Sequence, residues 1–150
     1  MNTLRVYIDT SVIGGCHDEE FARESRALLR MARERELMLL ISQTLIDEIR
    51  LAPQKVQQEL DGLPEWSTEL LPVNRQCLEL RDAYLEAGFL GQAHSNDALH
   101  VANATIARAD LIVSWNFKHI VHFDKIRGFN AVNLREGYLP IEIRSPMEVV

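Results

Sequence analysis

The sequence has no long hydrophobic run and only two cysteines. No apolar stretch approaches the roughly 18 consecutive residues that a membrane-spanning helix needs, and the N-terminus lacks the basic and hydrophobic segments of a secretory signal. Cys16 and Cys77 lie far apart and form no C-x-x-C pair, which speaks against a disulfide framework and against a zinc knuckle. We therefore expect reduced thiols, a cytoplasmic protein and no membrane partner.

Basic residues are also scarce. The chain has 16 Lys and Arg against 22 Asp and Glu, which gives a net charge of −6. Proteins that bind nucleic acid whatever its base sequence do so mostly through Lys and Arg contacts with phosphates. The negative net charge therefore speaks against a protein that coats nucleic acid. It is compatible with an enzyme that holds RNA through a local basic patch. A length of 150 residues, 47% of them hydrophobic, predicts one domain over 1–150.

Short apolar runs alternate with stretches of helical periodicity. The runs predict strands over residues 4–8, 37–41, 69–73, 110–115 and 141–144. The periodic stretches predict helices over residues 18–36, from Ser42 to before Pro53, from Pro53 onwards, and over 74–90, 97–109 and 124–134, with Ser42 and Asn96 as N-caps. This alternation predicts an α/β fold, a three-layer α/β/α arrangement around a central, mainly parallel sheet.

Three acidic residues fall near the carboxyl ends of these strands. Asp9 follows the first strand, Glu48 lies on the helix entered from the second, and Asp97 lies in the first turn of the helix before the strand 110–115. Ligands of open α/β sheets bind at this edge. Taken singly, Asp97 is typical of an acidic first helical turn and Glu48 of a solvated helical face. Their convergence on one edge is what indicates a site.

Three carboxylates brought close together repel one another unless protons or a cation neutralise them. Hard oxygen ligands favour Mg²⁺ or Mn²⁺. Such an ion lowers the pKa of a bound water and offsets the charge that develops on a phosphoryl oxygen. The sequence therefore predicts a metal site of Asp9, Glu48 and Asp97 that hydrolyses phosphodiesters.

Several short motifs, in this order, resemble those of the PIN-domain ribonucleases, many of which, such as the VapC-like proteins, are toxins of bacterial toxin–antitoxin pairs. The motifs cover nearly the whole chain: YIDTSVIGG, ISQTLIDEI and NDALHVANATIARADLIVSWNFKHI. The resemblance implies a metal-dependent endoribonuclease, commonly dimeric, with a cognate antitoxin as a partner. It matches Asp9, in its Asp-Thr-Ser turn with Thr10 and Ser11, to the first acid of the family, Glu48 to the second and Asp97 to the third.

The fourth acidic position of the family departs from the pattern. The sequence there is SWNFKH, with Ser114 and Asn116 in place of a further Asp. Asn116 brings no negative charge, so a second metal ion should bind weakly, and we expect the Asn116 amide to orient a water or a phosphate. Asp124 could supply the missing charge or be a helix-terminal acid. Ser11 could position a water or serve as a cap or turn residue, and its place in the turn favours the latter.

Residues that could contact the substrate follow the strand 110–115. Lys118, His119 and Lys125 would lie close to where RNA phosphates need to be. His100 lies one helical turn after Asp97, and a packed or hydrogen-bonded histidine is favoured there over a metal ligand. Trp115 could stack on a base, although core packing is the default for such a residue.

Two other families with an acid after the first strand fit this sequence less well. A haloacid-dehalogenase-like phosphatase needs a second Asp two residues after the first, where this chain has Ser11, and a receiver domain needs paired acids at the first strand. The main alternative is a PIN fold without catalysis that serves as a binding or scaffold module. Asn116 and the acidic net charge favour it, whereas the retained acids Asp9, Glu48 and Asp97 favour the enzyme.

Overall fold

A computed structural model describes residues 3–150, and its centre is a five-stranded parallel sheet. The strands lie in the order β3-β2-β1-β4-β5, and every neighbouring pair is parallel. Their bounds are β1 Leu4–Ile8, β2 Leu37–Ser42, β3 Thr68–Leu71, β4 Leu111–Val113 and β5 Glu142–Arg144. The predicted parallel sheet is therefore confirmed, with all five strands near their predicted places.

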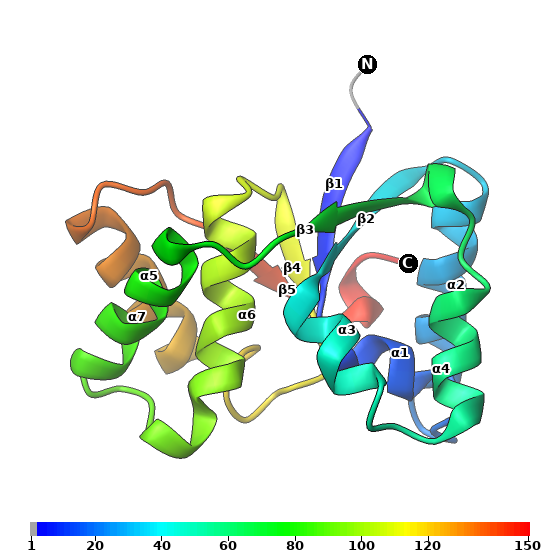
Figure 1. The fold of residues 1–150 in the computed structure, drawn as a ribbon, viewed down its shortest axis with the longest axis horizontal. Coiled ribbons are helices and arrows are strands. Elements are labelled where there is room, and N and C mark those ends of the chain that lie inside the picture. The colour runs from blue at the N-terminus through cyan, green and yellow to red at the C-terminus, as the bar shows by residue number, and fades with distance from the viewer. Residues whose placement is uncertain (1–2) are drawn as a thin grey trace.

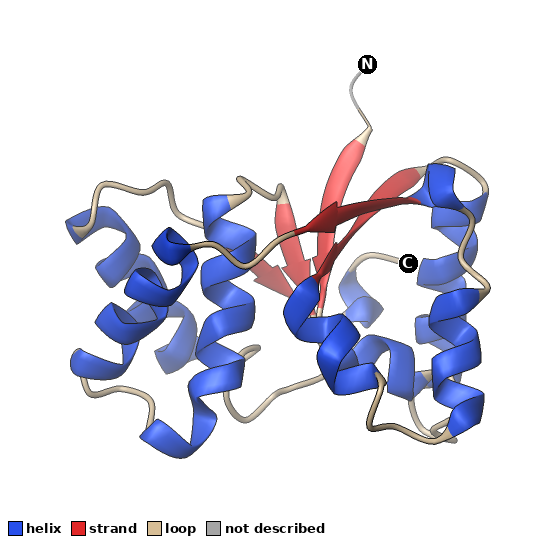
Figure 2. Cartoon of the chain, in the orientation of Figure 1, coloured by secondary structure: helices blue, strands red, loops and turns tan. Residues whose placement is uncertain are grey.

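Helices cover both faces of this sheet. They are α1 Thr10–Gly15, α2 Ala22–Arg33, α3 Gln43–Ile49, α4 Gln54–Asp61, α5 Arg75–Glu86, α6 Ser95–Ile106 and α7 Phe123–Arg135, with short 3-10 turns η1 Glu65–Ser67, η2 Gln92–His94 and η3 Pro146–Glu148. Figure 1 shows α5, α6 and α7 on one side of the strands and α1, α2 and α4 on the other, and Figure 2 shows the sheet between these two helical layers. The arrangement is the predicted three-layer α/β/α fold.

Alternation along the central strands builds two separate cores. Val6 and Ile8 of β1 pack among residues of α1 and α2, whereas Tyr7 between them packs with α5, α6 and α7. The same alternation sends Leu39 to the first core and Leu40 to the second. A strand that is buried on both faces needs apolar side chains on both, which is why residues 6–8 of β1 and 37–41 of β2 are continuous apolar runs in the sequence.

Two helix starts differ from the prediction. Residues 10–15 form α1, where no helix was predicted, and α2 begins only at Ala22. The signal for α1 is weak because Gly14 and Gly15 are poor helix formers and no side chain caps its N-terminus. Asn96 is not the cap of α6, since the helix already begins at Ser95 with His94 as its N-cap. Ser42 does cap α3, because its Oγ accepts the backbone N–H of Leu45 at 3.1 Å.

The cysteines and the helices agree with the expectations drawn from the sequence on disulfides and membrane spans. Cys16 and Cys77 are both free, as predicted, and both are buried. Between residues 3 and 150, no helix is both long enough and apolar enough to cross a membrane.

Candidate metal-dependent active site

The carboxyl edge of the sheet brings the predicted acids into one region. Asp9 directly follows β1, the middle strand, and occupies the N-cap position of α1. Glu48 lies on α3, which starts as soon as the neighbouring strand β2 ends. Asp97 lies in the first turn of α6, the helix that runs back toward the start of β4 on the other side of β1. The crossover connections thus deliver the three acids to the same edge.

Asp9 is the buried centre of this region, with a relative exposure of 4%. Ser11 Oγ donates a hydrogen bond to its Oδ1 at 2.5 Å, and Ser114 Oγ donates one to its Oδ2 at 2.8 Å. Burial raises the pKa of Asp9, and the charge of Asp97 raises it further, whereas His100 and the two serine hydroxyls act in the opposite direction. A cation placed near Asp9 would favour its ionised form.

Ser11 connects the turn after β1 to the end of β4. Besides donating to Asp9, its Oγ accepts the backbone N–H of Trp115 at 2.9 Å. Ser11 does not cap α1, because no side chain does, and it acts instead within the turn after β1. The hydroxyl instead fixes the orientation of the Asp9 carboxylate relative to the segment that follows β4.

Glu48 is held by a chain of hydrogen bonds from the interior. Its Oε1 accepts from Thr10 Oγ1 at 2.6 Å and lies 2.6 Å from His100 Nε2. Partial burial by itself raises the pKa of Glu48, but the hydrogen bond and charge of His100, together with Thr10, outweigh it, so the pKa is lowered. His100 is buried and hydrogen-bonded, as predicted.

The interior chain continues from His100 to the core. His100 Nδ1 lies 2.6 Å from Tyr7 Oη, which lies 2.8 Å from Ser42 Oγ. Burial keeps the pKa of Tyr7 well above its ordinary value, so its hydroxyl stays protonated. Ser42, Tyr7 and His100 thus form a continuous chain of hydrogen bonds that ends at Glu48 Oε1. Through this chain His100 orients the carboxylate of Glu48.

Asp97 makes its closest ion-pair contact with a histidine that the sequence interpretation missed. Its Oδ2 lies 3.6 Å from His94 Nδ1, in an i,i+3 relation. Within residues 3–150, one group of His, Cys, Asp or Glu side chains has ligand atoms that all lie within 4.8 Å of one another, namely His94, Asp97 and His119. Asp9, Glu48 and Asp97 therefore share an edge of the sheet but do not form one ligand set of this tightness. The i,i+3 spacing was the signal for His94.

At the fourth acidic position, Asn116 serves the local backbone. Its Oδ1 accepts the backbone N–H of His119 at 2.9 Å, and its own N–H donates to Ser114 Oγ at 2.9 Å. The side-chain NH₂ group is the part left to meet a water or a phosphate. Asp124 is exposed in the first turn of α7, the helix-terminal position that was one of its two predicted roles.

The predicted substrate-contacting residues differ in how free they are. Lys118 is exposed and His119 is half-buried. Lys125 is half-buried and its Nζ donates to the backbone carbonyl of Phe89, so it is tied to the protein surface. Trp115 belongs to the core, where it stacks on Phe21 at 4.2 Å between ring centroids and donates from Nε1 to Ser25 Oγ at 2.7 Å.

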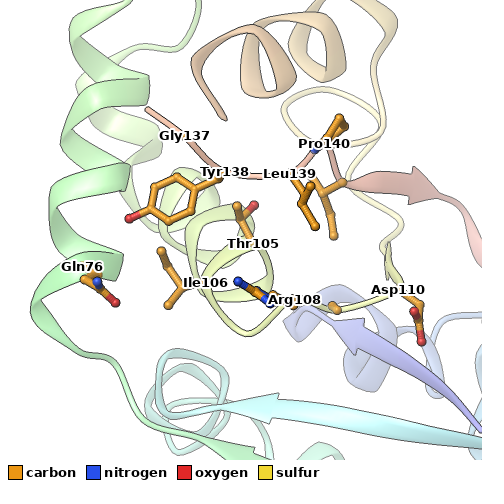
Figure 3. Close-up of a pocket in the computed structure, with 11 residues that line it drawn as sticks. Gln76, Thr105, Ile106, Arg108, Asp110, Gly137, Tyr138, Leu139 and Pro140 are labelled. Atoms are coloured by element: carbon orange, nitrogen blue, oxygen red, sulfur yellow. The ribbon is translucent and has the colours of Figure 1, made fainter. Parts of the chain in front are cut away.

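Two cavities lie at opposite edges of the sheet. One of about 330 Å³ opens beside Glu48, between α3 and α6, and Thr44, Asn96 and Leu99 are among its lining residues. Another of about 420 Å³ is shown in Figure 3, where Arg108, Asp110 and Tyr138 lie around it. This second cavity lies where β4 and β5 begin, away from the acids, so the first is the one that belongs to the site.

The chain is similar to known proteins in both sequence and fold. The sequence model of a family described as PIN domain matches residues 5–118. Among curated proteins, none matches the chain. Similar solved structures include a crystal structure of VapBC2 from Rickettsia felis bound to a DNA fragment from their promoter, with a TM-score of 0.61 and 14% identity over 95% of this chain and 98% of that chain. At this identity the similarity shows the fold alone.

Proposed function

Because the chain belongs to the PIN-domain family, we propose that it is a metal-dependent endoribonuclease that hydrolyses phosphodiester bonds of RNA. The observation that carries the proposal is the buried Asp9 carboxylate at the carboxyl edge of the sheet, whose pKa is raised by burial and by the nearby charge of Asp97. Keeping such a group in a fold is costly without a cation to neutralise it. Perturbed acids at a ligand-binding edge are typical of active sites.

The donor set fits Mg²⁺ or Mn²⁺. Asp9, Glu48 and Asp97 offer carboxylate oxygens, the ligands that these hard ions prefer, and would hold the ion directly or through water. Glu48 is ionised because His100 and Thr10 lower its pKa, so it is ready to face a cation. When bound, such an ion activates water and offsets charge on the phosphate.

The surrounding side chains have distinct tasks in this proposal. Ser11 and Ser114 fix both oxygens of Asp9 and so orient it toward the edge. The Asn116 amide orients a water or a phosphate oxygen. Lys118, exposed just beyond β4, attracts the RNA backbone, with a smaller contribution from His119 and Lys125.

The substrate is held locally rather than by a basic surface, because the net charge is −6. The cavity of about 330 Å³ lined by Glu48 offers room for a nucleotide next to this acid. As in the resemblance to toxins of toxin–antitoxin pairs, we assign the chain a cognate antitoxin as a partner and a homodimeric state. The similarity in fold to VapBC2 supports the first of these assignments.

The test is cleavage of a mixed pool of structured and single-stranded RNA by the purified protein with Mg²⁺ or Mn²⁺. We expect cutting that EDTA, Asp9→Asn and Glu48→Gln each abolish. Glu79→Gln is the matched control, because Glu79 is an exposed glutamate of α5 that does not line the cavity beside Glu48. Equal cutting by Glu79→Gln and the wild type assigns the loss in Glu48→Gln to the site.

The alternative, an inactive binding module, is tested in the same preparation by thermal melting. A ligand that binds only the folded state raises the melting temperature. Stabilisation by Mn²⁺ that Asp9→Asn removes, without cutting, would indicate a metal site with a narrow substrate range. Neither cutting nor stabilisation would favour the binding module.

A further inference from the structure

Two histidines extend the site beyond the acids. His94 ends η2 and forms the N-cap of α6, Asp97 lies in the first turn of that helix, and His119 lies in the turn after β4. One ligand atom from each of the three lies within 4.8 Å of the other two. These side chains come from two segments about 20 residues apart in sequence, so tertiary packing brings them together.

The two imidazoles are stacked, with 3.6 Å between their ring centroids and 27° between their planes. His119 Nδ1 is out of contact with solvent and has no hydrogen-bond partner among the described residues. A shielded ring nitrogen without a partner loses hydrogen bonds that it would have in water, which is unfavourable unless something binds there.

Both histidines are also positioned by their surroundings. Asn116 Oδ1 holds the backbone N–H of His119 at 2.9 Å, which fixes the turn that carries the ring. His94 and Asp97 lie three residues apart at the start of α6, a spacing that places side chains on the same helical face. The backbone positions of these three residues are therefore fixed by the fold.

We propose that His94, Asp97 and His119 bind a divalent transition-metal ion of the Zn²⁺ class. Two imidazoles and one carboxylate are a typical three-residue set for Zn²⁺ and leave a fourth position for water, whereas Mg²⁺ prefers oxygen ligands alone. Ligand atoms around tetrahedral Zn²⁺ lie about 3.4 Å apart, from metal–ligand lengths of about 2.0–2.2 Å. Atoms within 4.8 Å of one another reach that spacing by small side-chain rotations.

Sharing Asp97 couples this ion to the acidic site. Zn²⁺ on the two histidines engages the same carboxylate that the proposed nuclease uses, so low concentrations of Zn²⁺ inhibit cleavage supported by Mg²⁺. This inhibition rests on the proposed function. Zn²⁺ binding itself does not, because neither His94 nor His119 was needed to hold Mg²⁺ or Mn²⁺.

The test is calorimetric titration of the full chain with Zn²⁺ alone. We expect one equivalent to bind the wild type, and His94→Ala and His119→Ala to weaken the affinity by about tenfold or more. His122→Ala is the matched control, because His122 is an exposed histidine of the same segment as His119. Asp9→Asn, which damages the acidic site, should leave Zn²⁺ binding unchanged.

The proposal is overturned if His94→Ala and His119→Ala bind Zn²⁺ as the wild type does, or if Asp9→Asn weakens binding as much as they do. Should either histidine variant fold poorly, NMR of the wild type decides: Zn²⁺ must shift the ring resonances of His94 and His119 and leave those of His122 in place. A protein that neither cuts RNA nor gains stability from Mn²⁺ but passes the titration would refute the nuclease and keep the Zn²⁺ site.

Discussion

Asn116 accepts the backbone N–H of His119 through Oδ1 at 2.9 Å. The residue at the fourth acidic position thus builds the turn after β4, and an aspartate could do the same through one carboxylate oxygen. The second oxygen would add a negative charge close to Ser114, whose hydroxyl binds Asp9. The structure therefore allows the charge to be restored at this position without loss of the turn.

Asn116→Asp is expected to lower the Mn²⁺ concentration needed for half-maximal RNA cleavage by about tenfold, because the affinity of an oxygen-ligand site rises with its charge. The same variant should melt at a lower temperature in EDTA, because it adds a negative charge to the segment next to Ser114 and Asp9 with no cation to offset it. Measuring cleavage across a Mn²⁺ series checks the first effect. A variant that needs more Mn²⁺ than the wild type would contradict it.

Asp9→Asn is expected to stabilise the protein in EDTA while it abolishes cleavage. Burial raises the pKa of Asp9 above its usual 3.8, so the folded state keeps a proton at pH values where the unfolded chain has lost it. Stability therefore falls as the pH rises through this range. The neutral amide removes that loss, and we expect a melting temperature about 2–4 °C higher at pH 8, corresponding to about 1 kcal/mol.

Melting the two proteins at a lower pH provides the control for this prediction. The difference between Asp9→Asn and the wild type should narrow at pH 5, closer to the range in which both side chains are neutral. Thermal melts at pH 5 and pH 8 in EDTA measure it. A lower melting temperature for Asp9→Asn at pH 8 would show that the hydrogen bonds of the carboxylate with Ser11 and Ser114 outweigh its burial.

The strands and the edge that carries the acids could be predicted because they depend on local pattern and on a general rule of topology. Residues 6–8 and 37–41 are apolar throughout, and parallel crossovers place Asp9, Glu48 and Asp97 at one edge. The start of α1 could not be predicted, because its last two residues are the poor helix formers Gly14 and Gly15 and no side chain caps it.

The partners of the acids could not be predicted either, since they come from distant parts of the chain. His100 meets Tyr7 across 93 positions of sequence and Glu48 across 52. The pattern favoured a hydrogen-bonded His100 but could not say with which residue. His94 was missed because only the folded turn after β4 brings His119 onto its ring.

Tyr7→Phe is expected to weaken both the fold and cleavage. Removing the hydroxyl leaves buried His100 Nδ1 and Ser42 Oγ each without one hydrogen-bond partner. An unsatisfied buried group costs about 1–3 kcal/mol, which urea unfolding measures. Because His100 orients Glu48, the rate of RNA cleavage should fall beyond what the loss of folded protein explains.

Tyr84→Phe is the matched control for Tyr7→Phe. Tyr84 is equally buried and its hydroxyl donates to Asn133 Oδ1 at 2.5 Å, in the core formed with α7. Its loss should cost similar stability and leave cleavage by the folded protein unchanged. If both variants cut RNA equally well when folded, the chain from Tyr7 to Glu48 is structural only.

Gly15→Ala is expected to disturb Trp115, which lies in the segment after β4. A Cβ at Gly15 would lie 2.5 Å from Ser25 Oγ and 3.0 Å from Trp115 Nε1, the two atoms of a hydrogen bond of 2.7 Å. Overpacking of this kind costs about 1–3 kcal/mol.

Gly14→Ala is the control, because nothing lies within 4 Å of its Cβ and alanine favours the helix by about 0.5–1 kcal/mol. The backbone N–H of Trp115 donates to Ser11 Oγ, so Gly15→Ala should also raise the Mn²⁺ concentration that cleavage requires. Gly14→Ala should only raise the free energy of unfolding measured in urea. Equal stability of the two variants would mean that Ser25 and Trp115 rearrange without cost and that the Ser11 contact is not held in place by the tryptophan ring.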